Sequence, residues 1–101
     1  ITASLENFIE IASYLLKDFG EFYMVHRPDR LVDIFYLMRK NKIEPKKIRF
    51  VYPNKNKKAN LILIKGIKLA KPFLEYDDNL YVYDENNKYT KEILKIYNKI
   101  N

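Results

Sequence analysis

The chain has 101 residues, of which 48% are hydrophobic and 32% charged, and its formal net charge is +6. This length predicts one domain or less. The absence of cysteine excludes a disulfide framework and thiolate metal sites, and a single histidine argues against a histidine-based zinc site. No apolar window is long enough for a membrane span and no signal-peptide pattern is present, so we expect no membrane partner and a cytoplasmic location.

The positive charge favours a polyanionic partner such as nucleic acid. The alternative is a lysine-rich composition that only keeps the protein soluble, and the charge alone does not separate the two. The first residue is isoleucine and a helix is predicted to start close behind it, so we expect the chain to be cut from something longer.

The first predicted elements are a helix and a strand. Ser4 or Thr2 can cap the helix, and Gly20 is expected to supply the left-handed residue that ends it. The apolar residues of this helix follow helical spacing: Leu5, Phe8, Ile9, Ala12, Leu15, Leu16 and Phe19. Residues 21–25 form a short apolar run without helical periodicity, which predicts a buried strand.

A second helix and an antiparallel hairpin are predicted next. Pro28 suits the first position of the helix, and Asn41 is expected to stop it. Its predicted buried residues are Leu31, Ile34, Phe35 and Met38. Residues 47–52 alternate as in a half-buried strand, with Arg49 and Val51 on the outer face. The polar stretch PNKNKKAN then leads to residues 60–64, an apolar run typical of an interior strand.

The last third of the chain has weaker patterns. Residues 80–83 are expected to form a short strand and DENNK a turn, and Thr90 to cap a final helix. The apolar residues of that helix are Ile93, Leu94, Ile96, Tyr97 and Ile100. A strand–helix–strand unit predicts two parallel strands. Because two helices and three strands cannot cover both faces of a parallel sheet, we expect further structure on the N-terminal side.

A basic hairpin is the first candidate site. Six cations fall within thirteen residues that contain no acid: Lys46, Lys47, Arg49, Lys55, Lys57 and Lys58. Lysine and arginine neutralise phosphates, and exposed aromatic rings such as those of Phe50 and Tyr52 can stack on unpaired bases. The alternative is a solvated tip whose two aromatic rings point into the core, which the alternation favours. We predict substrate or RNA binding for Lys55, Lys57 and Lys58.

The junction FYMVHRPDR is the second candidate site. A strand end followed by a helix N-terminus can bind an anion, and His26, Arg27 and Arg30 are the candidate ligand-binding residues. Asp29 and Asp33, which can satisfy the helix start instead, support the alternative of an ordinary polar turn.

The chain lacks the patterns of a complete enzyme. It has no glycine-rich dinucleotide or phosphate loop and no set of residues for a serine–histidine–aspartate triad. An acidic cluster near the end is interpreted as a solvated loop; it contains Glu75, Asp77, Asp78, Asp84 and Glu85. We therefore assign no catalytic, cofactor-binding or metal-binding residue.

Three stretches carry a family resemblance: FYMVHRPDRLVDIFYLMRKNKIEPKKIRFVYP, ANLILIKGIK and YVYDENNKYTKEI. Together they resemble the C-terminal half of a bacterial S-adenosylmethionine-dependent methyltransferase, and most closely the tRNA(Val) adenine-37 N6-methyltransferase family. The resemblance implies an α/β fold, the C-terminal part of a class I (Rossmann-like) methyltransferase sheet: a βαβ unit, an antiparallel β-hairpin and a C-terminal helix. In this family the seventh strand is antiparallel and lies between the fifth and sixth, which here would be residues 60–64 between residues 21–25 and 47–52.

The resemblance also implies a function and a division of the chain. Residues 1–70 would be half of the methyltransferase domain and residues 71–101 a C-terminal extension. The parent enzyme would use S-adenosylmethionine to methylate N6 of an adenine in a tRNA anticodon loop. The fragment alone would be inactive, because the family's cofactor loop and Asn-Pro-Pro-Tyr/Phe motif are absent. The alternative from another class is a stand-alone nucleic-acid-binding or oligomerisation module without catalysis; an uncovered strand edge would allow a homodimer.

Overall fold

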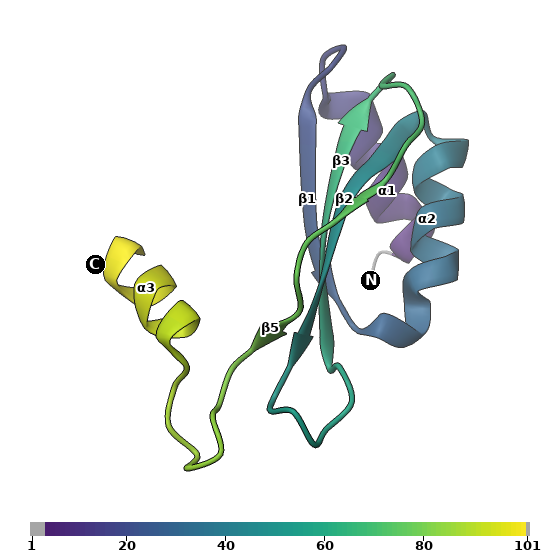
Figure 1. Ribbon diagram of the computed structural model, residues 1–101. Helices are drawn as coiled ribbons and strands as arrows, with labels where there is room; N and C mark the ends of the chain where they lie inside the picture. Colours follow the sequence, from purple (N-terminus) through teal and green to yellow (C-terminus); the bar gives the residue numbers. More distant parts are fainter. Residues whose placement is uncertain (1–3, 101) are drawn as a thin grey trace.

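The computed structural model describes residues 4–100 as a sheet flanked by helices (Figure 1). In chain order the elements are α1 (Leu5–Leu15), β1 (Glu21–His26), the short 3-10 turn η1 (Pro28–Arg30), α2 (Leu31–Lys40), β2 (Ile43–Tyr52), β3 (Leu61–Lys68), β4 (Glu75–Tyr76), β5 (Leu80–Tyr81) and α3 (Lys91–Ile100). Thr2, one of the two predicted caps of the first helix, lies outside the described residues. No helix within the described part of the chain is long and apolar enough to cross a membrane.

The central strand of the sheet is β3, which lies between β1 and β2 and is antiparallel to both. As a consequence β1 and β2 are parallel, and α2 connects them. This is the strand arrangement that the sequence predicts, and the predicted α/β fold class is confirmed. The two-residue strands β4 and β5 continue the sheet by pairing in parallel with the other side of β2.

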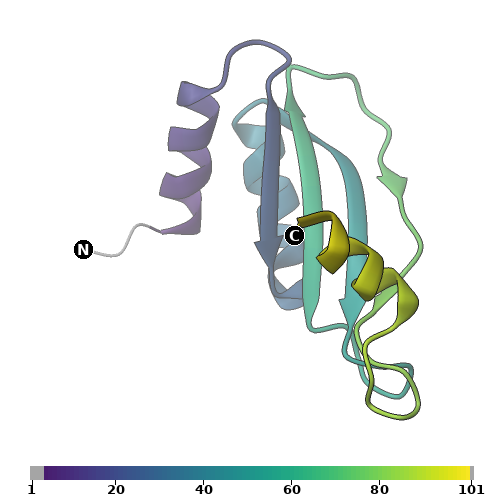
Figure 2. The ribbon, with the colours of Figure 1, turned by 90° about the vertical axis from the view of Figure 1, so that its left-hand side faces the viewer.

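One face of the sheet carries the hydrophobic core. Helices α1 and α2 pack on this face, whereas α3 lies on the opposite side of the sheet (Figures 1 and 2). The buried core residues alternate along the strands and follow helical spacing in the helices: Ile9, Phe22, Met24, Ile34, Met38, Ile43, Ile48, Ile62 and Ile64. Gly66 lets α2 approach β3, because a Cβ atom there would lie 2.5 Å from Cε of Met38 and 2.6 Å from Cγ2 of Ile43.

The turn after α1 differs from the prediction. The left-handed residue is Phe19, with φ of 62°, and not Gly20. Phe19 is held in this conformation because its N–H donates to the carbonyl of Lys68 and the Gly20 carbonyl accepts from the Lys68 N–H, each at 3.0 Å. Gly20 is needed for space instead, since a Cβ atom would lie 2.9 Å from the Lys17 carbonyl oxygen. The helix therefore ends at Leu15, before the predicted apolar repeat is complete.

Helix boundaries otherwise follow the predicted signals. The Ser4 hydroxyl accepts a 3.1 Å hydrogen bond from the Asn7 N–H at the start of α1, and Asn41 ends α2. Pro28 opens the 3-10 turn η1 and not the α-helix itself. Thr90 caps α3, since its hydroxyl accepts from the Ile93 N–H at 3.4 Å. Several of the apolar residues that follow helical spacing in the first and last helices are exposed: Phe8, Leu15, Leu94, Ile96 and Tyr97. Phe19, also exposed, lies beyond the end of α1.

Strand β2 differs from its predicted pattern in two ways. It begins at Ile43, four residues earlier than expected, because a bulge between Pro45 and Lys47 keeps it paired with β3 across a proline. Val51, expected on the outer face, is buried beside its neighbour Leu80 in β5. The period-2 pattern fails here because the C-terminal segment covers this end of β2.

Candidate functional site

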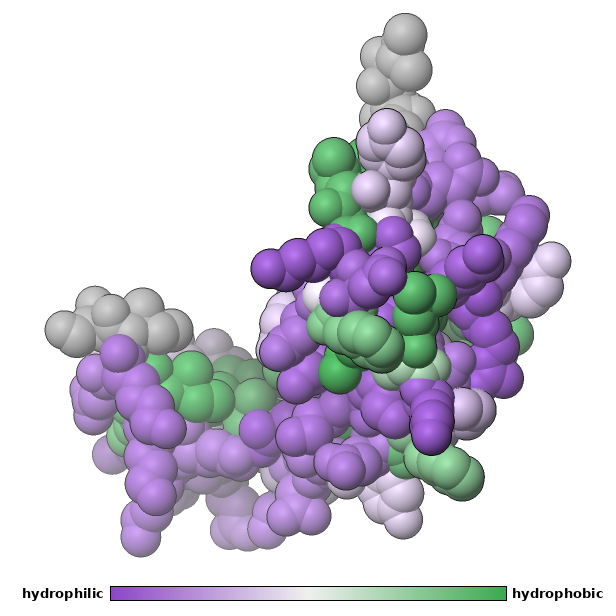
Figure 3. Space-filling model, turned by 90° about the horizontal axis from the view of Figure 1, so that it is seen from above, coloured by the Kyte–Doolittle hydropathy of each residue, from purple (hydrophilic) through white to green (hydrophobic). Residues whose placement is uncertain are grey.

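The carboxyl ends of β1 and β2 lie at the same edge of the sheet. His26 of β1 and Phe50 of β2 both face Ile62 of β3, one from each side. The β1–η1 junction and the β2–β3 hairpin loop therefore emerge together, at the lower end of the sheet in Figure 1. We call this end the carboxyl edge. The opposite end is covered mainly by hydrophilic side chains, with hydrophobic ones in separate patches (Figure 3).

The junction forms a polar turn in which each charged group has a nearby partner. Nδ1 of His26 accepts a 2.8 Å hydrogen bond from the Arg27 N–H, so the neutral ring carries its proton on Nε2. Arg27 pairs with Asp29 at 3.7 Å, and Nε of Arg30 donates to Asp33 at 2.9 Å. Asp29 lies in the first turn of η1 and Asp33 in the first turn of α2, where the alternative of an ordinary polar turn places them. Both also partly neutralise the arginines, which weakens the case for a phosphate at this turn.

A cavity of about 510 Å³ lies beside β1 and brings together two of the predicted residues. His26 and Arg30 line it, and so do Ser4 and Tyr23. The Tyr23 hydroxyl donates to Glu21 at 2.6 Å, which raises the pKa of Tyr23 and lowers the pKa of Glu21; Lys65, 3.4 Å from Glu21, lowers the Glu21 pKa further. Tyr23 on the cavity wall is thus hydrogen-bonded to Glu21, which itself lies outside the lining of the cavity.

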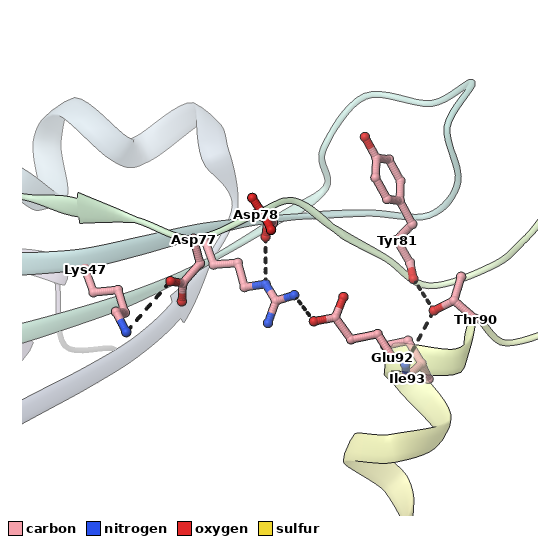
Figure 4. A network of polar contacts seen from close by, with 8 residues as sticks. Lys47, Asp77, Asp78, Tyr81, Thr90, Glu92 and Ile93 are labelled. Carbon is pink, nitrogen blue, oxygen red and sulfur yellow. Dashed lines mark hydrogen bonds and ion pairs between the residues drawn. The ribbon is translucent and has the colours of Figure 1, made fainter.

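The six cations of the basic hairpin divide into two groups with different roles. Lys46, Lys47 and Arg49 hold the C-terminal segment. Lys46 Nζ donates to the carbonyl of Lys71 at 2.9 Å, and Lys47 pairs with Asp77 at 3.8 Å. The Arg49 guanidinium lies between the Asp78 carbonyl oxygen, 2.9 Å from Nε, and the Glu92 carboxylate at the start of α3. Figure 4 shows these two contacts.

The other three cations, Lys55, Lys57 and Lys58, form the exposed tip of the hairpin. Within residues 4–100 no acidic group lies in ion-pair distance of any of them. The backbone beneath them is fixed, because Asn54 Oδ1 accepts a 2.8 Å hydrogen bond from the Asn56 N–H. Phe50 packs against the core and the Tyr52 ring lies 5.2 Å from the Tyr81 ring, so neither aromatic residue accompanies the lysines.

A second cavity of about 520 Å³ opens next to the hairpin tip. We call it the tyrosine–asparagine cavity. It lies between the tip, the end of β5 and the turn before α3, and its lining consists of Asn54, Lys55, Asn56, Tyr81, Tyr83, Asp84, Glu85, Asn86, Asn87 and Thr90. Of the predicted site residues only Lys55 lines it; His26 and Arg30 line the cavity beside β1, while Arg27, Lys57 and Lys58 line neither.

The two tyrosines of this cavity were not predicted as site residues, because YVYDENNK has the local pattern of a strand and a turn. The signal was present: Tyr81 and Tyr83 are two residues apart, so they share a face of an extended segment, and an asparagine-rich turn follows. What the sequence does not show is that this segment pairs with β2 directly beside the hairpin.

The acidic cluster does not form a catalytic pair. Asp77 is engaged with Lys47, and Asp84 Oδ1 accepts from the N–H groups of Asn86 and Lys88 at 2.8 and 3.1 Å, which shapes the turn. Among the described residues no group of three histidine, aspartate or glutamate side chains is placed to hold a metal ion. The arrangement suits binding of a ligand at the carboxyl edge.

Comparison with known proteins supports the fold and leaves the family open. No protein-family profile and no curated protein sequence matches the chain. The structure is similar to the crystal structure of a predicted O-methyltransferase from Agrobacterium tumefaciens, with a TM-score of 0.84 and 19% sequence identity. The match covers 93% of this chain and 45% of that protein, so the chain spans less than half of its structural neighbour. The protein therefore has a methyltransferase-like fold.

Replacement of Arg49 by methionine is expected to loosen the attachment of α3, because it removes both the Glu92 ion pair and the Asp78 hydrogen bond. These contacts are partly exposed and together contribute about 1 kcal/mol. The Ile93 and Leu94 amides in the first turn of α3 should then exchange about fivefold faster, as measured by hydrogen exchange and NMR. Lys57→Met, which removes an unpaired cation, is the matched control; equal exchange in the two variants would contradict the role of Arg49.

Proposed function

We propose that the chain is the C-terminal part of an S-adenosylmethionine-dependent RNA methyltransferase of the cytoplasm. The observation that carries this proposal is the presence at the carboxyl edge of a methyltransferase-like sheet of three lysines, Lys55, Lys57 and Lys58, that have no acidic partner within residues 4–100. Ligands of open α/β sheets bind at the carboxyl ends of the strands. Lysines without acidic partners at that edge suit the phosphates of a nucleic acid.

The finer part of the proposal is methylation of N6 of an adenine in a tRNA anticodon loop. Its support is the sequence resemblance described above, together with a cationic hairpin tip that can lie along an RNA backbone. A base in a loop is accessible to extrusion into a pocket, which a base inside a duplex is not. In this interpretation Lys55, Lys57 and Lys58 position the RNA, and His26, Arg27 and Arg30 lie at the rim of the site.

The cofactor would be held mainly outside this chain. The residues of the chain include no glycine-rich loop and no Asn-Pro-Pro-Tyr/Phe motif. S-adenosylmethionine, when bound, would supply the activated methyl group. Residues 1–70 would contribute half of the catalytic sheet and residues 71–101 an extension; the chain by itself is expected to be inactive.

A second candidate function rests on the free edge of β1. Within the described residues β1 pairs only with β3, and the adjoining helix α1 exposes Phe8, Ile11 and Leu15. A strand edge next to apolar side chains can pair with another copy of the chain. The second candidate is therefore a homodimeric nucleic-acid-binding module without catalysis.

Calorimetric titration of the full-length protein with S-adenosylmethionine separates the two candidates. A methyltransferase is expected to bind the cofactor with one site per protein and to transfer a labelled methyl group to tRNA. Absence of binding, together with a dimer in sedimentation equilibrium, would reject the methyltransferase in favour of the module.

The RNA-binding role of the hairpin tip is tested by the triple charge reversal Lys55→Glu, Lys57→Glu and Lys58→Glu. We expect RNA binding to weaken at low salt. The magnitude of the negative slope of log K against log salt should decrease by about 2, since each lost contact with single-stranded RNA contributes about 0.7. Lys91→Glu, Lys95→Glu and Lys99→Glu on α3 form the matched control, because both triple variants have the same net charge. If both weaken binding equally, net charge and not the hairpin tip accounts for it.

A further inference from the structure

The tyrosine–asparagine cavity has features of a base-binding site that the proposed function does not require. We propose that it binds one unpaired nucleobase of the RNA, stacked on Tyr83, while the neighbouring phosphates lie on the hairpin lysines. This inference rests on the RNA partner of the proposed function and adds a binding site next to the hairpin tip. The cavity volume of about 520 Å³ is within the usual range of small-ligand pockets, roughly 300–1,000 Å³.

The aromatic wall is already arranged for stacking. The Tyr83 and Tyr89 rings are stacked, with their centres 5.3 Å apart and their planes at 17°. Tyr83 lines the cavity and Tyr89 does not, so we place the base on the face of Tyr83 that is turned away from Tyr89. A base placed against Tyr83 would extend this stack by one member. Stacking of a base on an aromatic side chain tolerates every sequence, because each base has a flat π-face.

The walls of the cavity are held in place by hydrogen bonds to the backbone. The Tyr83 N–H donates to the Pro53 carbonyl at 2.8 Å, which ties the aromatic wall directly to the start of the hairpin loop. The Thr90 hydroxyl donates to the Tyr81 carbonyl at 2.6 Å, as Figure 4 shows. On the third side, the Asp84 carboxylate fixes the turn. A preformed site loses little conformational entropy when a ligand binds.

Polar groups suited to base edges surround the ring. The side-chain amides of Asn56, Asn86 and Asn87 make no hydrogen bond within residues 4–100, although all three line the cavity. An asparagine amide presents a donor and an acceptor together, which matches the edge of a base such as adenine. Two neighbouring amides on the turn and one on the hairpin tip thus face the same space.

The charges of the cavity favour a base over a phosphate inside it. Lys55 is the one cation among its lining residues, whereas Asp84 and Glu85 are both acidic. A phosphate would be repelled by these carboxylates, but an exocyclic amine of adenine or cytosine can donate to one. Lys57 and Lys58 lie outside the cavity on the same loop, where they can contact the phosphates on either side of the bound nucleotide.

Binding of a short single-stranded RNA to the full 101-residue chain tests this assignment. The probe is a fluorescein-labelled oligoribonucleotide with one 2-aminopurine, read by fluorescence anisotropy and by 2-aminopurine emission. We expect the 2-aminopurine emission to be quenched on binding. Tyr83→Ala should bind the RNA about fivefold more weakly or worse, since fivefold corresponds to the lower end of the stacking energies found for a base on an aromatic side chain. Tyr83→Phe keeps the ring and should bind like the parent chain. Tyr36→Ala, which removes an exposed tyrosine from α2, is the matched control.

Three results would overturn the proposal: unchanged affinity in Tyr83→Ala, unquenched 2-aminopurine on binding to the parent chain, or equal affinity for an oligonucleotide of the same length without bases. The 2-aminopurine emission and the affinity for the base-free oligonucleotide are both measured with the parent chain. They therefore test the base site even if Tyr83→Ala does not fold. If one of these results is found but RNA binding is still weakened by the charge reversal of Lys55, Lys57 and Lys58, the base site is rejected and the RNA-binding role of the hairpin tip is retained. Failure of the methyltransferase proposal would appear separately, in the cofactor titration.

Discussion

The antiparallel pairing of β3 with both of its neighbours is the constraint on which the rest of the structure depends. Because β3 runs opposite to β1 and β2, those two strands are parallel and end at one edge. Each ladder spans most of the strand length, and a shift of one residue would move every core side chain to the wrong face. Gly66 lies within β3 where Met38 and Ile43 leave no room for a Cβ atom, so the helix that connects β1 to β2 packs directly on this strand.

The position of β3 also explains how the positive charge of the chain is used. The hairpin that joins β2 to β3 carries six cations, and the three nearest its base are occupied by the segment that follows β3. That segment returns along β2 and brings Tyr81, Tyr83 and the asparagine-rich turn next to the hairpin tip. Charge thus serves two functions here: it holds the C-terminal segment on the sheet, and it leaves three lysines free at the carboxyl edge.

The sequence predicted the order of the elements well because local signals determine them. Pro28, Asn41, Thr90 and the polar loop after Pro53 act through backbone conformation and nearby hydrogen bonds. The insertion of β3 between the other strands was not available from periodicity; it came from the family resemblance. The methyltransferase-like fold of the structural neighbour agrees with that resemblance at 19% identity, where sequence comparison alone finds no match.

Most of the errors share one physical origin, since they depend on contacts between residues far apart in the chain. Phe19 adopts a left-handed conformation because Lys68 pairs with its N–H, and Val51 is buried because Leu80 lies beside it. The tyrosine–asparagine cavity was missed for the same reason. The Tyr83 N–H donates a hydrogen bond to the Pro53 carbonyl at the start of the hairpin loop, and Arg49 forms an ion pair with Glu92 at the start of α3. No local pattern encodes such pairings.

The central claim is that the carboxyl edge of the sheet is the RNA-binding surface, and amide chemical shifts of the isotopically labelled chain test it most directly. During titration with a single-stranded RNA, we expect the largest shifts in residues 26–30, 54–58 and 81–87, which follow or adjoin the carboxyl ends of β1 and β2. Shifts confined to the opposite end, at residues 17–20, 41–42 and 68–71, or spread along α1 and α2, would contradict the account.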